Sequence, residues 1–151
     1  MEKKHRIIRL GFGLYAAVLL VLLFDRTPYA ADGSYWQQLA GNLNLVPFRT
    51  ILEFARLLLY RRNPLLIPHA IVNLLGNVAV FVPLGVFLPA LWPKLRSRRA
   101  VTLWTAAGIV CIELAQLFTL RGSCDIDDLI LNLLGTELGF TLWKAWRRFS
   151  R

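Results

Sequence analysis

Long apolar segments alternate with short polar or basic segments along this chain of 151 residues. Four apolar runs each approach the roughly 20 residues that a helix needs to cross about 30 Å of hydrocarbon. They extend over residues 7–24, 69–91, 101–120 and 126–146. The pattern predicts an all-α polytopic membrane protein built as a bundle of four transmembrane helices.

The first apolar run also fits a secretory signal peptide, because basic residues precede it. The run is long for a signal peptide, and the Thr27–Asp32 segment that follows it lacks a small-x-small cleavage site. We therefore favour a helix that is not cleaved.

The segment between the first two runs, residues 25–68, contains a further helical pattern. Its polar face consists of Arg49, Glu53, Arg56 and Tyr60. Apolar residues occupy the other side, and prolines bound the segment at both ends. The spacing predicts an amphipathic helix over about residues 48–60, either at the membrane surface or against the bundle.

The basic residues are placed at the ends of the apolar runs. The chain has a formal net charge of +9, but its lysines and arginines do not line one amphipathic face, which argues against nucleic acid as a partner. Three groups lie around residues 1–6, 92–100 and 147–151, and a further group, Arg49, Arg56, Arg61 and Arg62, lies within residues 25–68 and weakens the contrast. The positive-inside rule places the first three groups in the cytoplasm, and residues 25–68 and 121–125 outside.

The residues that usually hold metals are sparse. Cys111, Cys124, His5 and His69 stand alone, with no Cys-x-x-Cys pair, and neither a disulfide nor a zinc site is expected. The Asp125–Asp128 segment lacks the central glycine of a calcium-binding loop. We expect no metal and no cofactor.

Polar residues that are costly in hydrocarbon share one level of the predicted bundle, in the outer halves of the last three runs. The candidate site residues are Asn73, Asn77, Glu113, Gln116, Arg121, Asp125, Asp128 and Asn132. Spacings of three, four and seven place them on common helix faces. The alternative is that the amides only join helices, at about 0.6 kcal/mol per contact, and that Asp127 is a helix cap exposed to water.

The Glu113 carboxylate requires a partner, because it lies about two turns below the predicted outer surface. Arg121 lies two turns later on the same helical face and is the candidate partner. We predict a functional polar pocket that opens to the outer surface. A ligand with a polar head and an apolar tail would suit it.

Ordered motifs support a family resemblance over about residues 40–140. They are Asn44-Leu-Val-Pro-Phe48, Asn73-Leu-Leu-Gly-Asn77, Phe81-Val-Pro-Leu-Gly85, Glu113-Leu-Ala-Gln116, and then Arg121, Asp125, Asp128, Asn132 and Gly135. This series resembles the VanZ-like family of small bacterial membrane proteins. The resemblance implies a multi-pass protein of the bacterial cell (inner) membrane. Its founding member is associated with resistance to teicoplanin, a glycopeptide antibiotic with an acyl tail, and the resemblance implies no catalytic reaction.

Two classes of function follow. In the first, a non-enzymatic membrane protein binds an amphiphilic cell-envelope molecule or a lipoglycopeptide. Arg121 would bind an anionic group of that ligand, while carboxylates such as Asp128 would bind amines, hydroxyl groups or a cation. In the second, an intramembrane enzyme acts on a lipid-linked envelope substrate through Glu113 or Asp128 as acid or base. The lipid bilayer is the expected partner in both classes, and the oligomeric state stays open.

Overall fold

The computed structural model describes residues 2–24, 33–60 and 64–149. Within them the chain forms the helices α1 (Glu2–Phe24), α2 (Tyr35–Gly41), α3 (Arg49–Tyr60), α4 (Ile67–Leu91), α5 (Arg98–Phe118) and α6 (Ile126–Phe149). Short 3-10 turns at Pro64–Leu66 and Pro93–Leu95 precede α4 and α5. Two strands of two residues each, β1 (Leu43–Asn44) and β2 (Cys124–Asp125), complete the fold.

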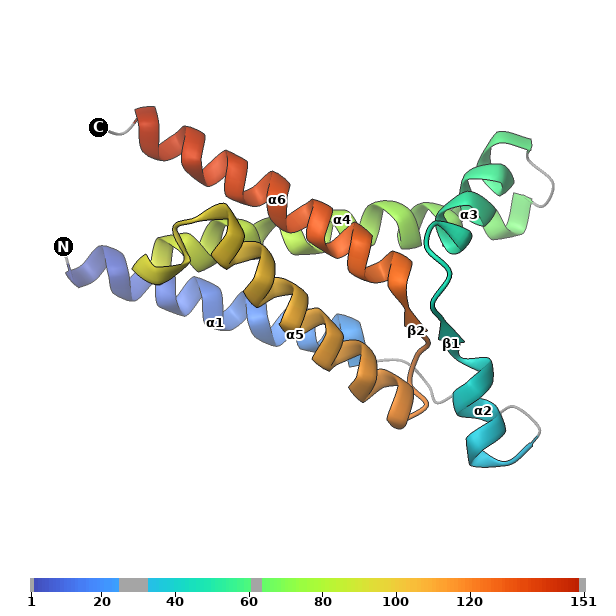
Figure 1. Ribbon diagram of the computed structural model, residues 1–151. Helices are drawn as coiled ribbons and strands as arrows, with labels where there is room; N and C mark the ends of the chain where they lie inside the picture. Colours follow the sequence, from blue (N-terminus) through green and yellow to red (C-terminus); the bar gives the residue numbers. More distant parts are fainter. Residues whose placement is uncertain (1, 25–32, 61–63, 150–151) are drawn as a thin grey trace.

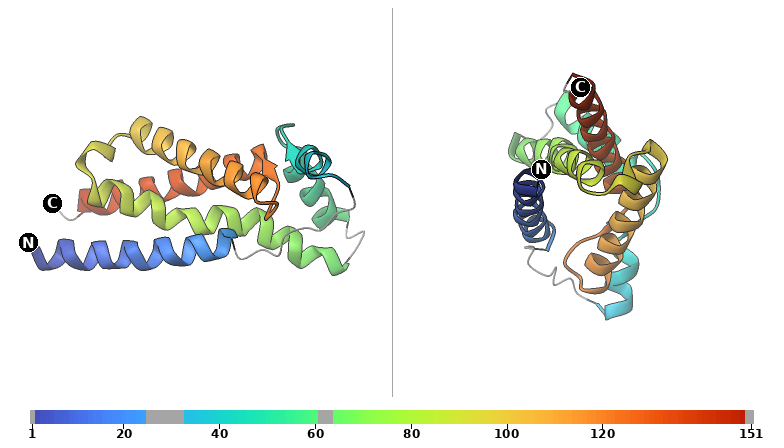
Figure 2. Two further views of the ribbon diagram at one scale, coloured as in Figure 1. Left: turned by 90° about the horizontal axis from the view of Figure 1, so that it is seen from below. Right: turned by 90° about the vertical axis from the view of Figure 1, so that its left-hand side faces the viewer.

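The long helices α1, α4, α5 and α6 form an elongated bundle, and both chain termini lie at one end of it (Figure 1). The short elements α2, β1 and α3 lie at the opposite end, beside β2 and the start of α6 (Figures 1 and 2). Residues 33–60, from the segment before the second apolar run, therefore lie at one end of the bundle.

Three helices are long and apolar enough to cross a membrane, over His5–Phe24, Ile67–Leu91 and Arg98–Phe118. This confirms a helical membrane protein, whereas the fourth predicted span stays a prediction. That span corresponds to α6, which is 24 residues long and carries buried polar residues. They lower its mean hydropathy although they face other helices.

Small residues bring α4 and α6 into close contact. A Cβ atom added at Gly135 or Gly139 would lie 2.1 or 1.9 Å from a backbone oxygen of α4. A Cβ atom at Gly85 would lie 2.0 Å from a backbone oxygen of α6. No side chain fits at such separations, so glycine at these positions sets the distance between the two helices.

Among the described residues, buried apolar side chains form two packed clusters. One joins α1, α4 and α5 and contains Leu19, Leu23, Phe81 and Ile109. The other joins α5 and α6 and contains Val101, Phe140 and Trp143. Large apolar side chains also face outward, as on α1, where Ile7, Leu10 and Leu14 are about 70% exposed. A bilayer would cover such a surface.

Strands β1 and β2 pair in parallel, with Leu43 opposite Cys124 and Asn44 opposite Asp125. This pairing fastens the segment before α3 to the start of α6. Neither the strands nor α2 was expected from the sequence. The Ser34 hydroxyl and the Gln37 side chain form a capping box at the start of α2, a Ser-x-x-Gln signal that the sequence does contain.

Candidate functional site

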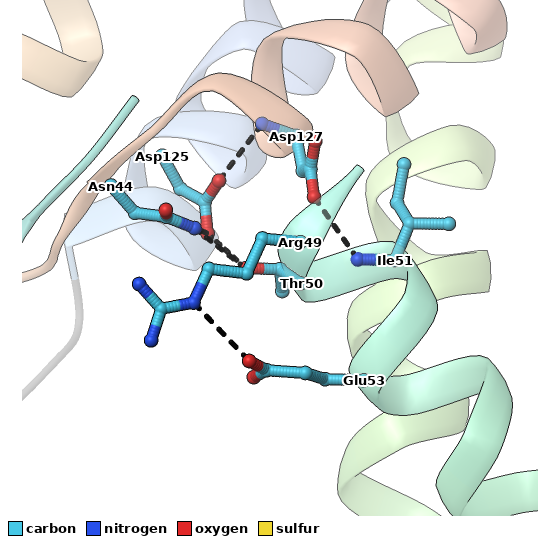
Figure 3. Close-up of polar contacts among 7 residues, drawn as sticks. All are labelled: Asn44, Arg49, Thr50, Ile51, Glu53, Asp125 and Asp127. Atoms are coloured by element: carbon cyan, nitrogen blue, oxygen red, sulfur yellow. Dashed lines mark hydrogen bonds and ion pairs between the residues drawn. The ribbon is translucent and has the colours of Figure 1, made fainter. Parts of the chain in front are cut away.

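A polar network forms where α3 meets the start of α6, around the Asp125 carboxylate (Figure 3). One oxygen, Oδ1, accepts a hydrogen bond from the backbone N–H of Asp127 at 2.8 Å, so Asp125 caps α6. The other, Oδ2, accepts from the Thr50 hydroxyl at 2.6 Å and the Asn44 amide at 3.1 Å. Asp125 is 7% exposed, and its own backbone N–H donates to the Glu113 carboxylate at 3.1 Å.

Asp127 is fully buried, which corrects the alternative expectation of a cap exposed to water. Its carboxylate accepts hydrogen bonds from the backbone N–H groups of Phe48 and Ile51, at 2.5 and 3.0 Å. The side chain does cap a helix, but that helix is α3. The physical reason is the direction of the side chain. Side chains in the first turn of a helix point toward its N-terminus, and the start of α3 lies next to the N-terminus of α6.

The third carboxylate, Asp128, connects α6 to α4. Its Oδ1 accepts a hydrogen bond from the Asn77 amide at 2.5 Å, and the residue is 9% exposed. Asn73 lies one turn before Asn77, and its buried Oδ1 accepts no hydrogen bond from the part of the chain that the structure describes. The same holds for the Oδ1 of Asn132, deeper in α6.

A cavity of about 610 Å³ opens beside these groups, between α1, α3, α4 and the start of α6. Its polar lining residues are Thr50, Glu53, His69, Asn73, Asn77, Ser123, Asp125 and Asp128. Its apolar lining residues are Leu22, Leu23, Phe54, Val72, Val80 and Phe81. The volume suits a small organic molecule, and the lining offers it both carboxylates and hydrocarbon.

Four of the predicted site residues, Asn73, Asn77, Asp125 and Asp128, line this cavity. Glu113 is not among its lining residues; it is 6% exposed and lies behind the cavity wall, where its carboxylate holds the backbone of Asp125. The structure therefore divides the candidate cluster into residues that face the cavity and residues that support them.

Gln116 and Arg121 hold the end of α1. The Gln116 amide donates to the carbonyl oxygen of Leu23 at 2.6 Å, and the Arg121 guanidinium donates to that of Phe24 at 3.1 Å. The partner suggested for Arg121 was Glu113, whereas its observed contact is with a helix terminus. Carbonyl groups in the last turn of a helix have no partner within the helix, and these two side chains supply donors.

Thr50, Glu53 and His69 also line the cavity, although they were not among the predicted site residues. The polar face of the predicted amphipathic helix contained Glu53. Its side chain also pairs with Arg49 at 3.2 Å on the exposed side of α3 (Figure 3). The sequence signal for the lining residues of α3 was the amphipathic pattern over residues 48–60.

Cys124 lies in the turn before α6 as a free thiol. Burial raises its pKa, and the negative charges of Glu113 and Asp125 raise that pKa further. No group of three or more His, Cys, Asp and Glu side chains that could hold a metal ion occurs among residues 2–24, 33–60 and 64–149. The polar network is thus held by hydrogen bonds from amide, hydroxyl and backbone groups.

Comparison with known proteins identifies a family. A search of curated proteins found no significant similarity. A search of solved structures found none either. The model of the VanZ/LLP1 family matches residues 12–147, a range that begins within α1, ends near the end of α6 and includes every residue of the polar network. The resemblance predicted from the motifs is confirmed, and the chain belongs to the VanZ/LLP1 family.

Proposed function

We propose that this protein binds an amphiphilic molecule of the cell envelope in the cavity beside α3, at the outer side of a membrane that α1, α4, α5 and α6 all cross. The observation that carries the proposal is the cavity itself. Its lining combines the carboxylates of Asp125 and Asp128 with apolar side chains in one space of about 610 Å³.

The exposed face of α6 supports a fourth crossing. Leu134, Leu138 and Leu142 are 50%, 47% and 58% exposed and recur every four residues, so they form one apolar stripe. The polar residues Asn132 and Thr136 are buried on another side of the helix. Such a distribution suits a membrane helix that turns its polar side chains toward the bundle.

Basic residues support the orientation. The end of the bundle that contains both termini also contains the segment between α4 and α5, with Lys94, Arg96, Arg98 and Arg99 (Figure 1). The positive-inside rule assigns this end to the cytoplasm. The cavity beside α3 then lies on the outer side, where envelope precursors and antibiotics are presented.

The chemistry of the lining residues defines the ligand class. Carboxylates at Glu53, Asp125 and Asp128 favour amines and hydroxyl groups, and an acyl chain would lie against the apolar lining residues. Asn73 adds a hydrogen-bond acceptor that has no partner among the described residues. Arg121 lies outside the lining residues, so an anionic group on the ligand is not part of this proposal.

Resistance to teicoplanin is the phenotype that fits best, because this antibiotic carries an acyl tail that its relative vancomycin lacks. Membership of the VanZ/LLP1 family supports the same phenotype. Engagement of the drug or of its envelope target in the cavity would depend on the tail, so protection should be selective for the acylated drug.

Drug susceptibility in a Gram-positive host tests the proposal. The strains express the wild type, Asp128→Asn, Glu137→Gln or an empty vector at matched membrane levels. Asparagine keeps an oxygen that can accept from Asn77, removes the negative charge and replaces the second oxygen with an NH2 group. Glu137→Gln is the matched control, since its carboxylate pairs with Arg98 at 3.0 Å and does not line the cavity.

We expect the wild type and Glu137→Gln to raise the inhibitory concentration of teicoplanin and not that of vancomycin, and Asp128→Asn to lose this effect. Equal protection by wild type and Asp128→Asn would show that the cavity carboxylate has no part in it. Absence of protection in all strains would remove the resistance phenotype from the proposal.

The second function class, an intramembrane enzyme, assigns acid and base roles to Glu113 and Asp128. Only Asp128 lines the cavity, whereas the Glu113 carboxylate holds the backbone of Asp125. A general acid or base must reach the reacting group directly or through one water. Binding is therefore the better supported role for this cavity.

A further inference from the structure

A second cavity, of about 820 Å³, lies at the opposite end of the bundle, between the segment that precedes α5 and the last turns of α6. Its lining includes five basic side chains and one buried indole: Arg96, Arg98, Lys144, Arg147, Arg148 and Trp143. None of the residues that line it is acidic. The function proposed for the other cavity makes no use of this one.

Contacts within the protein fix three of the guanidinium groups around this basic cavity. Arg96 donates to the carbonyl oxygen of Pro89 at 3.2 Å. Arg98 pairs with Glu137 at 3.0 Å, so one of the five positive charges is offset. Arg147 lies over the ring of Trp143, with its central carbon 5.4 Å from the ring centre. These donors are therefore oriented before any ligand binds.

The remaining two basic residues, Lys144 and Arg148, are exposed and lie four positions apart on the same face of α6. Arginine and lysine side chains that converge on one space favour a phosphate group, which accepts several charge-assisted hydrogen bonds at once. Ser97, the N-cap of α5, and Arg98, its first residue, also line the cavity, and the start of a helix favours an anion.

Two exposed tryptophans indicate the depth of this cavity. Trp92 ends α4 and is 42% exposed, and Trp146 lies in the last turns of α6 and is 53% exposed. Tryptophan is enriched where the hydrocarbon core of a membrane meets the lipid head groups. Both side chains lie at the end of the bundle that carries the basic cavity, and the cavity therefore lies at the level of the lipid phosphates.

We infer that the basic cavity binds the phosphate group of an anionic phospholipid. Cavities of this kind between the cytoplasmic ends of membrane helices suit anionic head groups, and the acyl chains would lie along the apolar surface of the bundle. Inorganic phosphate shares the recognised chemistry, and the experiment separates the two sources.

Native mass spectrometry of the purified full chain in neutral detergent measures binding directly. The probes are phosphatidylglycerol, which is anionic, phosphatidylcholine, which is zwitterionic, and inorganic phosphate as a competitor. The cavity variant is Lys144→Gln with Arg148→Gln. The matched control is Arg6→Gln with Arg9→Gln, which removes the same charge from exposed positions of α1 at the same end of the bundle. A charge-retaining variant, Lys144→Arg with Arg148→Lys, tests for a merely structural effect.

We expect phosphatidylglycerol to bind more tightly than phosphatidylcholine. Each basic side chain near an anionic lipid raises the binding affinity roughly fivefold, so the variant without Lys144 and Arg148 should bind phosphatidylglycerol about 25-fold more weakly. The α1 control and the charge-retaining variant should stay within about twofold of wild type. If millimolar phosphate displaces phosphatidylglycerol, the cavity also binds free phosphate. If phosphatidylglycerol stays bound, the cavity is specific for the lipid.

Three results would overturn the inference: equal binding of the two lipids, wild-type affinity in the cavity variant, or an equal loss in the α1 control. The last result would attribute binding to general charge at this end of the protein.

Discussion

Replacing Asp127 with alanine tests how the start of α6 holds α3, a helix that lines the cavity of about 610 Å³. The carboxylate accepts hydrogen bonds from the backbone N–H groups of Phe48 and Ile51. Phe48 has a φ of 66°, in the left-handed region that costs a non-glycine residue about 1–2 kcal/mol. The substitution removes both acceptors while this cost remains, so the first turn of α3 should open more often.

The size of the effect follows from the two hydrogen bonds. A bond to a charged group contributes about 1.5–3 kcal/mol, and the loss of a helix cap costs about 0.5–2 kcal/mol. Phe48 is 54% exposed, so water partly replaces the acceptor there. We therefore expect local opening of α3 to become easier by about 2–3 kcal/mol, which is a roughly 30- to 150-fold loss of amide protection.

Hydrogen–deuterium exchange of the purified protein, read from peptides that cover Arg49–Tyr60, measures this loss. The control is Glu53→Gln, which removes an exposed ion pair with Arg49 and should change protection by no more than about twofold. Exchange in the second half of α6 should stay as in the wild type. If Asp127→Ala keeps wild-type protection in α3, the cap does not hold this helix, and packing against α4 does.

Two further predictions concern the helix contact and the turn thiol. Gly139→Ala should abolish or strongly lower the yield of folded protein, because its Cβ atom would lie 1.9 Å from the backbone oxygen of Val82. Size-exclusion chromatography in detergent measures that yield. The control is Gly108→Ala, where nothing lies within 4 Å of the added Cβ atom, and it should fold as the wild type does. Cys124 should react slowly with maleimide at pH 8 and faster as pH rises, because a raised pKa lowers the thiolate fraction. Glu113→Gln removes one cause of the raised pKa and should speed the reaction at pH 8, measured in a chain whose other cysteine is serine. An unchanged rate would mean that the Glu113 charge does not act on the thiol.

Part of the site was accessible to prediction from local patterns. Asn73 and Asn77 recur at a spacing of four, which predicts one helix face, and Asp128 lies in the first turn of the predicted last helix, three residues after Asp125 in the outer turn. The structure places all four around one cavity. The helical, membrane-spanning character followed from the apolar runs in the same way, because hydrocarbon requires every backbone polar group to be paired within its own segment.

The contacts between distant segments were not accessible to prediction. The polar network joins Asn44 and Thr50 to Asp125, across 75 or more positions in the chain. The sequence around Asp127 indicates only an acidic residue in the first turn of a helix. The structure shows that its carboxylate accepts hydrogen bonds from the start of α3. Arg121 and Glu113 share a helical spacing, but the chain turns between them, and each meets backbone groups elsewhere.

The sequence by itself determined the class of protein, its long helices and the level at which polar residues collect, because these depend on composition and on the 3.6-residue period of a helix. The tertiary structure alone decided which carboxylates face a cavity and which hold the backbone. That division depends on how α3 lies against α4 and α6, and a helix period carries no information about the position of a segment 75 residues away.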